Sequence, residues 1–231
     1  MKLTSIIMTT KIRTKTECHM TMSAIDCIGK YTNPDEYELI VVDPEPSEPI
    51  RDDYHILPKF IHLKPSPDPD YASCMNLGAK EAKGDYLVFI QNDVFVDEGW
   101  LPGLRQYLES GMFDYVFPDQ IPRSREFVLE SYKLDPFSPA IIGGPFVGAR
   151  DAGLIMMTKE IYDKTGGWGE GMSILAEKDM YIKLAAAGGK EAQTTKVFIT
   201  HIMGAANWYQ SATDPEGYDK RMKKDADKLN G

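Results

Sequence analysis

The stretch GDYLVFIQND, residues 84–93, contains an apolar run that ends abruptly in an amide and a carboxylate. The apolar residues, Tyr86 to Ile90, are mostly β-branched or aromatic and are bounded by turn-forming residues, which predicts a short strand covered on both faces. In an open α/β sheet, ligands bind in the crevice outside the carboxyl ends of the strands. We therefore expect Asn92 and Asp93 to lie at the rim of a functional site. The alternative interpretation is a strand followed by an Asx turn with no further role.

The composition limits the class of protein. A length of 231 residues, with 42% hydrophobic and 26% charged residues, suits one large globular domain, alone or with a small appendage. The net charge of −9 argues against a general binder of nucleic acid or anionic membranes, because phosphates are bound by concentrated Lys and Arg. A locally basic cleft stays open. The three cysteines, Cys18, Cys27 and Cys74, have the spacing of neither a disulfide framework nor a zinc site.

The N-terminal segment MKLTSIIMTTKIR has a short apolar run broken by threonines and no small-residue cleavage pattern after it, so we interpret it as the first strand. No apolar run approaches the roughly 20 residues that a membrane helix needs. We expect a soluble, cytoplasmic protein without a transmembrane segment.

Strands and helices alternate along the first hundred residues, which predicts a mostly parallel, doubly wound α/β sheet with helices on both faces. The helix that precedes the opening stretch is expected to end at Gly84 in a left-handed cap. Residues 111–150 are rich in Pro and Gly and are expected to be irregular, with a loop around Arg123 and Arg125. The strands are expected at residues 5–8, 39–42, 60–63, 86–90, 115–118, 154–158 and 197–201, and the main helices at 14–27, 73–83, 100–110, 175–187 and 218–229.

Three segments in this order carry a family resemblance: TSIIMTTKIR with Thr9, LIVVDPEPS with Asp43, and MNLGAKEAKGDYLVFIQND. The third combines Asn76, Gly78, Ala82, Gly84, Asp85 and Asp93 at fixed spacing, a set far more specific than a lone D-x-D. Over about residues 3–204, the chain resembles the inverting GT-A glycosyltransferases of family 2.

The resemblance implies a GT-A domain over residues 1–210, with a nucleotide-binding half at 1–110, an acceptor half at 111–210, and a C-terminal helical tail at 211–231. It implies an enzyme that transfers a sugar with inversion from a UDP-, GDP- or TDP-sugar to a hydroxyl acceptor, a glycan or a small molecule. A nucleic-acid acceptor is disfavoured by the charge, but a modified base that carries a hydroxyl stays open.

The resemblance also assigns the donor site. Asp43 is expected to accept a hydrogen bond from the base, and the expected donor-nucleotide residues are Thr9, Asp43, Asn76, Asn92 and Asp93. A diphosphate leaving group needs its developing charge neutralised, so Asp93 and His201 are expected to hold Mn²⁺ or Mg²⁺. Asn92 stands where an acid is common, so metal affinity is expected to depend on the bound nucleotide. The basic side chain that contacts the diphosphate is expected to come from Lys11, Arg13 or the 123–125 loop.

The segment GGWGEGMSILAEKDMYIKLAAAG occupies the place of the family's general-base helix, and the resemblance implies that Glu177 and Asp179 are its catalytic carboxylates. Helical spacing favours Glu177 as the base, because it shares a stripe with Met180, Tyr181 and Leu184. The alternative is that both acids merely stabilise the N-terminal end of this helix. Trp168 is expected on the acceptor side, with a core anchor as the alternative.

Two other functions are compatible with a sheet of this kind. Sugar-1-phosphate nucleotidyltransferases carry a glycine-rich loop after the first strand, and TTKIRTKT lacks it. A non-catalytic nucleotide-sugar-binding protein with a GT-A fold stays open, because Asn92 and Met75 depart from the family pattern.

Overall fold

The computed structural model of the protein describes residues 2–10, 12, 15–43, 60–63, 69–120, 153–202, 211 and 213–230. The strands of this part are β1 (Thr4–Thr9), β2 (Tyr37–Val42), β3 (Phe60–Leu63), β4 (Tyr86–Gln91), β5 (Val94–Val96), β6 (Tyr115–Gln120), β7 (Leu154–Thr158) and β8 (Glu191–His201). The helices are α1 (Lys15–Tyr31), α3 (Tyr71–Glu81), α4 (Trp100–Glu109), α6 (Lys159–Thr165), α7 (Ala176–Ala186) and α9 (Pro215–Asn230).

The strands form one sheet in the order β3-β2-β1-β4-β7-β6-β8-β5. The pairs β3–β2, β2–β1 and β1–β4 are parallel, as is β6–β8, whereas β7 runs antiparallel to both of its neighbours and β5 antiparallel to β8. The predicted α/β class, with a doubly wound and mostly parallel sheet, is confirmed. Two strands differ from the prediction: β5 was not predicted, and β8 begins at Glu191 rather than at Val197. The first half of β8, EAQTTK, is too polar to show a strand's apolar pattern.

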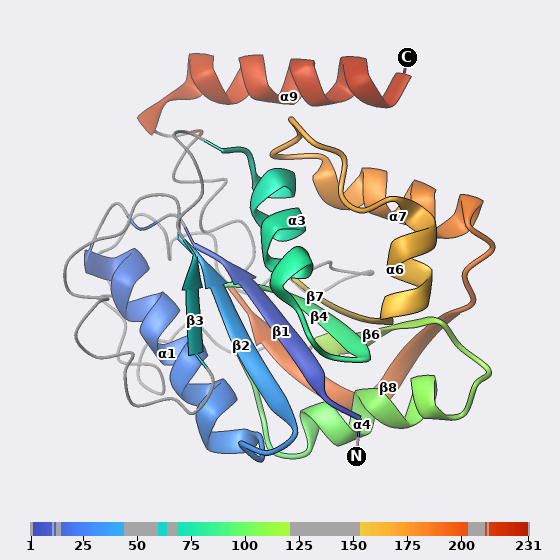
Figure 1. Cartoon of the computed structure of the whole chain (residues 1–231). Helices are drawn as coiled ribbons and strands as arrows, with labels where there is room; N and C mark the ends of the chain where they lie inside the picture. Colours follow the sequence, from blue (N-terminus) through green and yellow to red (C-terminus); the bar gives the residue numbers. More distant parts are fainter. Residues whose placement is uncertain are drawn as a thin grey trace.

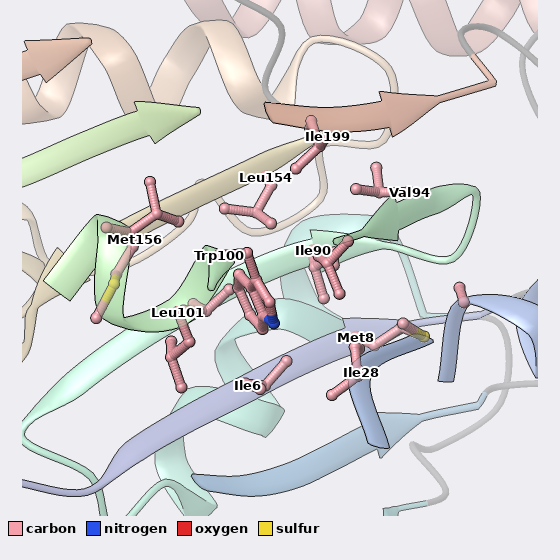
Figure 2. Packing of buried hydrophobic residues seen from close by; sticks show 14 of the residues in the cluster. Ile6, Met8, Ile28, Ile90, Val94, Trp100, Leu101, Leu154, Met156 and Ile199 are labelled. Carbon is pink, nitrogen blue, oxygen red and sulfur yellow. The ribbon is translucent and has the colours of Figure 1, made fainter. Parts of the chain in front are cut away.

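Helices cover both faces of the sheet, as Figure 1 shows. Ile6 and Met8 of β1 point into one apolar cluster, which includes side chains of α1 and α4, while Ile7 between them points into the other, with α3, α6 and α7. Figure 2 shows the first cluster, where Trp100 lies close to Ile6 and Ile90. Burial on both faces explains why β4 reads as a continuous apolar run.

Gly84 differs from its predicted role. Helix α3 ends earlier, with Ala82 as its C-cap in an extended conformation (φ −65°, ψ 132°), and Gly84 is not among the glycines with positive φ. A Cβ on Gly84 would lie 2.6 Å from the backbone nitrogen of Ser5 and 2.8 Å from the carbonyl oxygen of Leu3. The position therefore requires glycine because the chain passes against the start of β1, and not because a left-handed cap is formed.

Gly78, in α3, is required for a similar reason. Its added Cβ would lie 2.4 Å from Cγ2 of Ile7, so the missing side chain lets α3 lie directly on β1. Helix α3 begins at Tyr71, two residues before the expected start, because Asp70 is its N-cap and accepts a hydrogen bond of 2.9 Å from the amide of Ser73. This fixes the end of α3 that faces the carboxyl ends of the strands.

The C-terminal helix α9 lies across α3 and the start of α7, at the end of the sheet to which β1 and β2 point (Figure 1). The predicted helix at residues 218–229 is thus confirmed, with a longer N-terminal end. Within the described ranges, no helix is both long and apolar enough to cross a membrane. Residues 121–152, including the expected loop around Arg123 and Arg125, lie outside the described residues.

Candidate active site

Three parallel strands bring candidate residues to one edge of the sheet. Thr9, the last residue of β1, pairs with Val42 on one side and with Gln91 on the other. Asp43 follows Val42 and is completely buried, and Asn92 and Asp93 follow Gln91. The carboxyl ends of β1, β2 and β4 therefore place Thr9, Asp43 and Asp93 at the same rim of the sheet, where α/β folds commonly bind ligands.

Asp93 and His201 meet at the turn between β4 and β5. Val94 pairs with His201, and the amide of Ile202 donates to the carbonyl of Asp93 at 3.0 Å. Oδ1 of Asp93 lies 3.2 Å from Nε2 of His201, and both side chains are only 4% exposed. The antiparallel pairing of β5 with β8 thus joins two residues that are far apart in the sequence.

The chemistry of this pair fits a divalent cation. A carboxylate oxygen and an imidazole nitrogen are both ligands of Mn²⁺-like ions, and two such ligands at about 2.1 Å from one ion lie roughly 3 Å apart at a right angle. The described residues contain no group of three or more His, Cys, Asp or Glu side chains placed to hold a metal. A cation held by Asp93 and His201 would need further oxygen ligands from a diphosphate or water.

Gly153 sets the position of the His201 ring. A Cβ at this glycine would lie 2.6 Å from Nδ1 of His201 and 2.8 Å from its Cε1. The carbonyl of Gly153 also accepts a hydrogen bond of 2.8 Å from the amide of Gln91. The residue before β7 therefore supports the imidazole and the end of β4 together. Sequence reasoning missed Gly153, because a single glycine before a strand carries no distinctive signal.

Glu177 reaches the same rim from α7. The side-chain amide of Gln91 donates to Oε1 of Glu177, which fixes this carboxylate at the end of β4, two residues before Asp93. Burial, reinforced by the negative charges of Glu177 and Asp93, raises the pKa of the Tyr71 hydroxyl well above its usual range. Tyr71 is thus close enough to each of the two carboxylates to interact with it electrostatically. Sequence reasoning missed Gln91 and Tyr71, although Tyr71 directly follows a helix N-cap that faces the rim.

Asp179 contacts the glycine-rich turn before α7. Its carboxylate forms an ion pair of 2.9 Å with Nζ of Lys183, which also donates to the carbonyl of Gly167 at 3.0 Å. A Cβ on Gly169 would lie 2.5 Å from Oδ2 of Asp179, so the acid packs against the glycine-rich turn. Of the two candidate acids, Glu177 is the one in contact with the end of β4.

Asn76 links α3 to the glycine-rich turn. Its amide nitrogen donates to the carbonyl of Trp168 at 2.9 Å, and its Oδ1 accepts hydrogen bonds from the Trp168 amide at 2.8 Å and from the Tyr162 hydroxyl at 2.9 Å. Trp168 is 2% exposed and packs edge-on against Phe89 and Tyr71 at ring distances of 5.2 and 5.7 Å. This placement agrees with the core-anchor interpretation of Trp168 and leaves no open indole face for an acceptor.

Asn92 bonds within the protein as well. Its amide nitrogen donates to Oγ1 of Thr21 at 2.8 Å, and Thr21 donates to the carbonyl of Glu17 at 2.8 Å. The β4–β5 turn is thereby held to α1. Of the candidate phosphate-binding residues, Lys11, Arg13, Arg123 and Arg125 lie outside the described residues.

The model of the family "Glycosyl transferase family 2" matches residues 5–165, which is well over half of the chain. This chain belongs to glycosyl transferase family 2. The match ends before α7, so it does not include Glu177 or His201.

Solved structures agree with this family 2 fold. The mannosyltransferase PcManGT from Pyrobaculum calidifontis, in complex with GDP-Man and Mn²⁺, is similar with a TM-score of 0.65 and 16% identity, over 90% of this chain and 59% of that one. TarS 1–349 from S. aureus matches with a TM-score of 0.62 and 14% identity over 86% of this chain and 60% of its own, and its complex with UDP-GlcNAc with 0.61 and 12% over 87% and 60%.

The TM-scores show a shared GT-A fold, whereas identities of 12–16% do not show a shared substrate. The family 2 chain spans about three fifths of the length of the solved structures that it matches. Among curated proteins, no match was found.

Proposed function

We propose that this protein is a glycosyltransferase that moves a sugar from a nucleotide donor to a hydroxyl acceptor with inversion. The observation that carries the proposal is the Gln91–Glu177 hydrogen bond, which joins a carboxylate of α7 to the end of β4, two residues before Asp93, in a family 2 chain. The GDP-Man and UDP-GlcNAc complexes of similar folds support a nucleotide sugar as the donor.

Glu177 is the proposed general base. An acceptor hydroxyl within hydrogen-bond distance of its carboxylate would lose a proton to it while its oxygen forms a bond to the anomeric carbon. The bond from that carbon to the phosphate oxygen breaks, and its electron pair leaves with the nucleoside diphosphate. Attack from the face opposite the leaving group inverts the configuration. Gln91 would hold Glu177 in orientation through its side-chain amide.

Asp93 and His201 are the proposed protein ligands of Mn²⁺ or Mg²⁺, which when bound neutralises charge on the diphosphate. Thr9 and Asp43 are proposed to contact the nucleoside, because they end the neighbouring strands β1 and β2 at the same rim. Asn76 and Asn92 already bond inside the protein, so we propose that they support the donor site through the turns that they hold. The cytoplasmic location and the boundary at residue 210 stay predictions.

The experiment compares Glu177→Gln and Asp93→Ala with wild type across UDP-, GDP- and TDP-sugars in Mn²⁺ or Mg²⁺. Wild type should be stabilised by a matching donor and release its nucleoside diphosphate. Glu177→Gln should keep the donor-induced rise in melting temperature but transfer about 10²- to 10⁴-fold more slowly, the usual worth of a general base. Asp93→Ala should lose metal-dependent donor binding.

Glu81→Gln is the matched control, because Glu81 is exposed at the far end of α3 and undergoes the same chemical change. Neither stabilisation nor product with any of these donors would contradict the proposal. Stabilisation of wild type without product, unchanged in Glu177→Gln, would identify the alternative function, a nucleotide-sugar-binding protein that does not turn over. The specific observation behind this alternative is that Asp93 and His201 supply only two ligands for a cation.

A further inference from the structure

We infer that Asp225, in the C-terminal helix α9, is a positioning residue for Glu177. Oδ2 of Asp225 accepts hydrogen bonds from three consecutive backbone amides, those of Ser173 at 2.9 Å, Ile174 at 2.6 Å and Leu175 at 3.0 Å. The side chain lies about fifty residues from these partners in the sequence and is 1% exposed. The three amides immediately precede α7, which carries Glu177 in its first turn.

The start of α7 needs a partner from outside the helix. Its N-cap is Leu175, whose side chain forms no capping bond and whose own amide donates to Asp225. The two acids of the first turn do not serve this purpose: Glu177 bonds with Gln91, and Asp179 pairs with Lys183. Asp225 supplies the negative charge that the N-terminal end of a helix favours.

Two further residues of α9 contact the segment before α7 and the apolar cluster beneath it. Nζ of Lys228 donates to the carbonyl of Glu170 at 2.6 Å, and Leu229 packs against the apolar cluster that includes α7. Asp225 is the buried residue of α9, whose other described side chains are partly or fully exposed. A buried carboxylate is costly unless it is fully hydrogen-bonded, so its three amide donors largely determine how α9 docks. Figure 1 shows α9 lying across this side of the molecule.

Glu177 is close in sequence to the amides that Asp225 binds, so a shift of these amides should move Glu177 as well. Glu177 lies two residues after Leu175, the last amide that Asp225 holds. A shift of about 1 Å in a catalytic group costs on the order of a hundredfold in rate. Loosening the turn at residues 173–175 should therefore misplace the Glu177 carboxylate while leaving the donor contacts of β1, β2 and β4 intact. This inference rests on the proposed role of Glu177 as the base.

The test uses the full chain with Asp225→Ala, Asp225→Asn and the control Asp227→Asn. Asn keeps one acceptor oxygen but removes the charge, so it gives a milder change if the Ala variant folds poorly. Asp227 is exposed on the same helix. Hydrogen exchange of the amides of residues 173–175 is measured beside kcat and the donor KM. We expect exchange to rise about tenfold or more in Asp225→Ala, less in Asp225→Asn, and not at all in Asp227→Asn.

In Asp225→Ala, kcat should fall about 10- to 100-fold, with a smaller fall in Asp225→Asn and none in Asp227→Asn. The donor KM should change little in all three variants. Unchanged exchange in both Asp225 variants would overturn the inference. Faster exchange with the kcat of wild type would show that the turn is held but does not position the base, which also overturns it. If wild type transfers no sugar, the proposed function fails, and the exchange of residues 173–175 alone decides whether Asp225 holds this turn.

Discussion

Gly153 lies against the imidazole of His201, so the ring that is proposed to bind a cation packs on a residue without a side chain. We expect Gly153→Ala to displace the ring, because the new Cβ would lie within 2.6–2.8 Å of two of its atoms. Residues that orient metal ligands typically change affinity 10- to 100-fold. Metal-dependent binding of a nucleoside diphosphate, measured by calorimetric titration with Mn²⁺, should weaken by about that factor.

Gly188→Ala is the control for this substitution. Gly188 has a φ of +72° and no atom within 4 Å of an added Cβ, so the substitution strains the backbone far from the site. It should lower the free energy of unfolding by about 1–2 kcal/mol without changing the titration. Equal metal-dependent affinity in the two variants would show that His201 tolerates the displacement or takes no part in the site.

For single residues, the sequence predicted where they lie better than it predicted why they are needed there. Asp93 follows its strand and lies at the rim, as expected, because a buried strand with an abrupt polar end leaves few alternatives. Gly84 is required, but for close approach to Ser5 rather than for a left-handed cap. The hydrogen bond of Asn92 with Thr21 was not foreseeable, because the pairing of distant side chains depends on tertiary packing.

Among the secondary-structure elements, Asn76 connects α3 with the turn between α6 and α7. The structure gives it three hydrogen bonds, two of them with the backbone of the buried Trp168. We expect Asn76→Ala to leave the amide and the carbonyl of Trp168 without partners. Each unsatisfied buried group costs about 1–3 kcal/mol, so the free energy of unfolding, measured by urea denaturation, should fall by roughly 2–6 kcal/mol.

Asn33→Ala is the matched control. Asn33 is exposed, and its side chain accepts one hydrogen bond, from the amide of Asp35 at 3.1 Å. Its removal should cost less than about 1 kcal/mol. If Asn76→Ala were as stable as Asn33→Ala but failed to bind donor, Asn76 would be a direct donor contact, as the family resemblance first implied, and not a support for the turn.

The elements themselves followed from apolar patterning wherever the pattern was strong. β1, β2 and β4 each contain a short apolar run and were expected within two residues of their bounds. β5 has three residues, too few for a period to appear, and the first half of β8 is polar. The docking of α9 through Asp225 could not be expected, because the acids of a lysine-rich helix usually face solvent.

Across the whole molecule, the candidate site is assembled from both ends of the chain. β1, β2 and β4 supply the residues proposed for the nucleotide side, while α7 and β8 supply Glu177 and His201. The order of these segments made the family recognisable from sequence. The mutual contacts, Gln91 with Glu177 and Asp93 with His201, required the three-dimensional fold because more than eighty residues separate the partners.

This division of the site predicts how ligands stabilise the whole fold. Asp93 and His201 offer two ligands, and Asn92 adds no carboxylate, so a cation alone should bind weakly and the diphosphate should supply the missing oxygens. A ligand at a hundred times its dissociation constant stabilises a protein by about 2.7 kcal/mol. For a chain of 231 residues, that corresponds to a rise in melting temperature of about 5–10 °C.

We therefore expect Mn²⁺ alone to leave the melting temperature nearly unchanged, and Mn²⁺ with the matching nucleoside diphosphate to raise it by about 5–10 °C. Asp93→Ala should abolish the joint effect, whereas Glu81→Gln, at an exposed position in α3, should keep it. A rise with Mn²⁺ alone as large as that with both ligands would mean that the protein completes the cation site by itself. The charge missing at Asn92 would then have to be supplied by another acidic residue close to the cation.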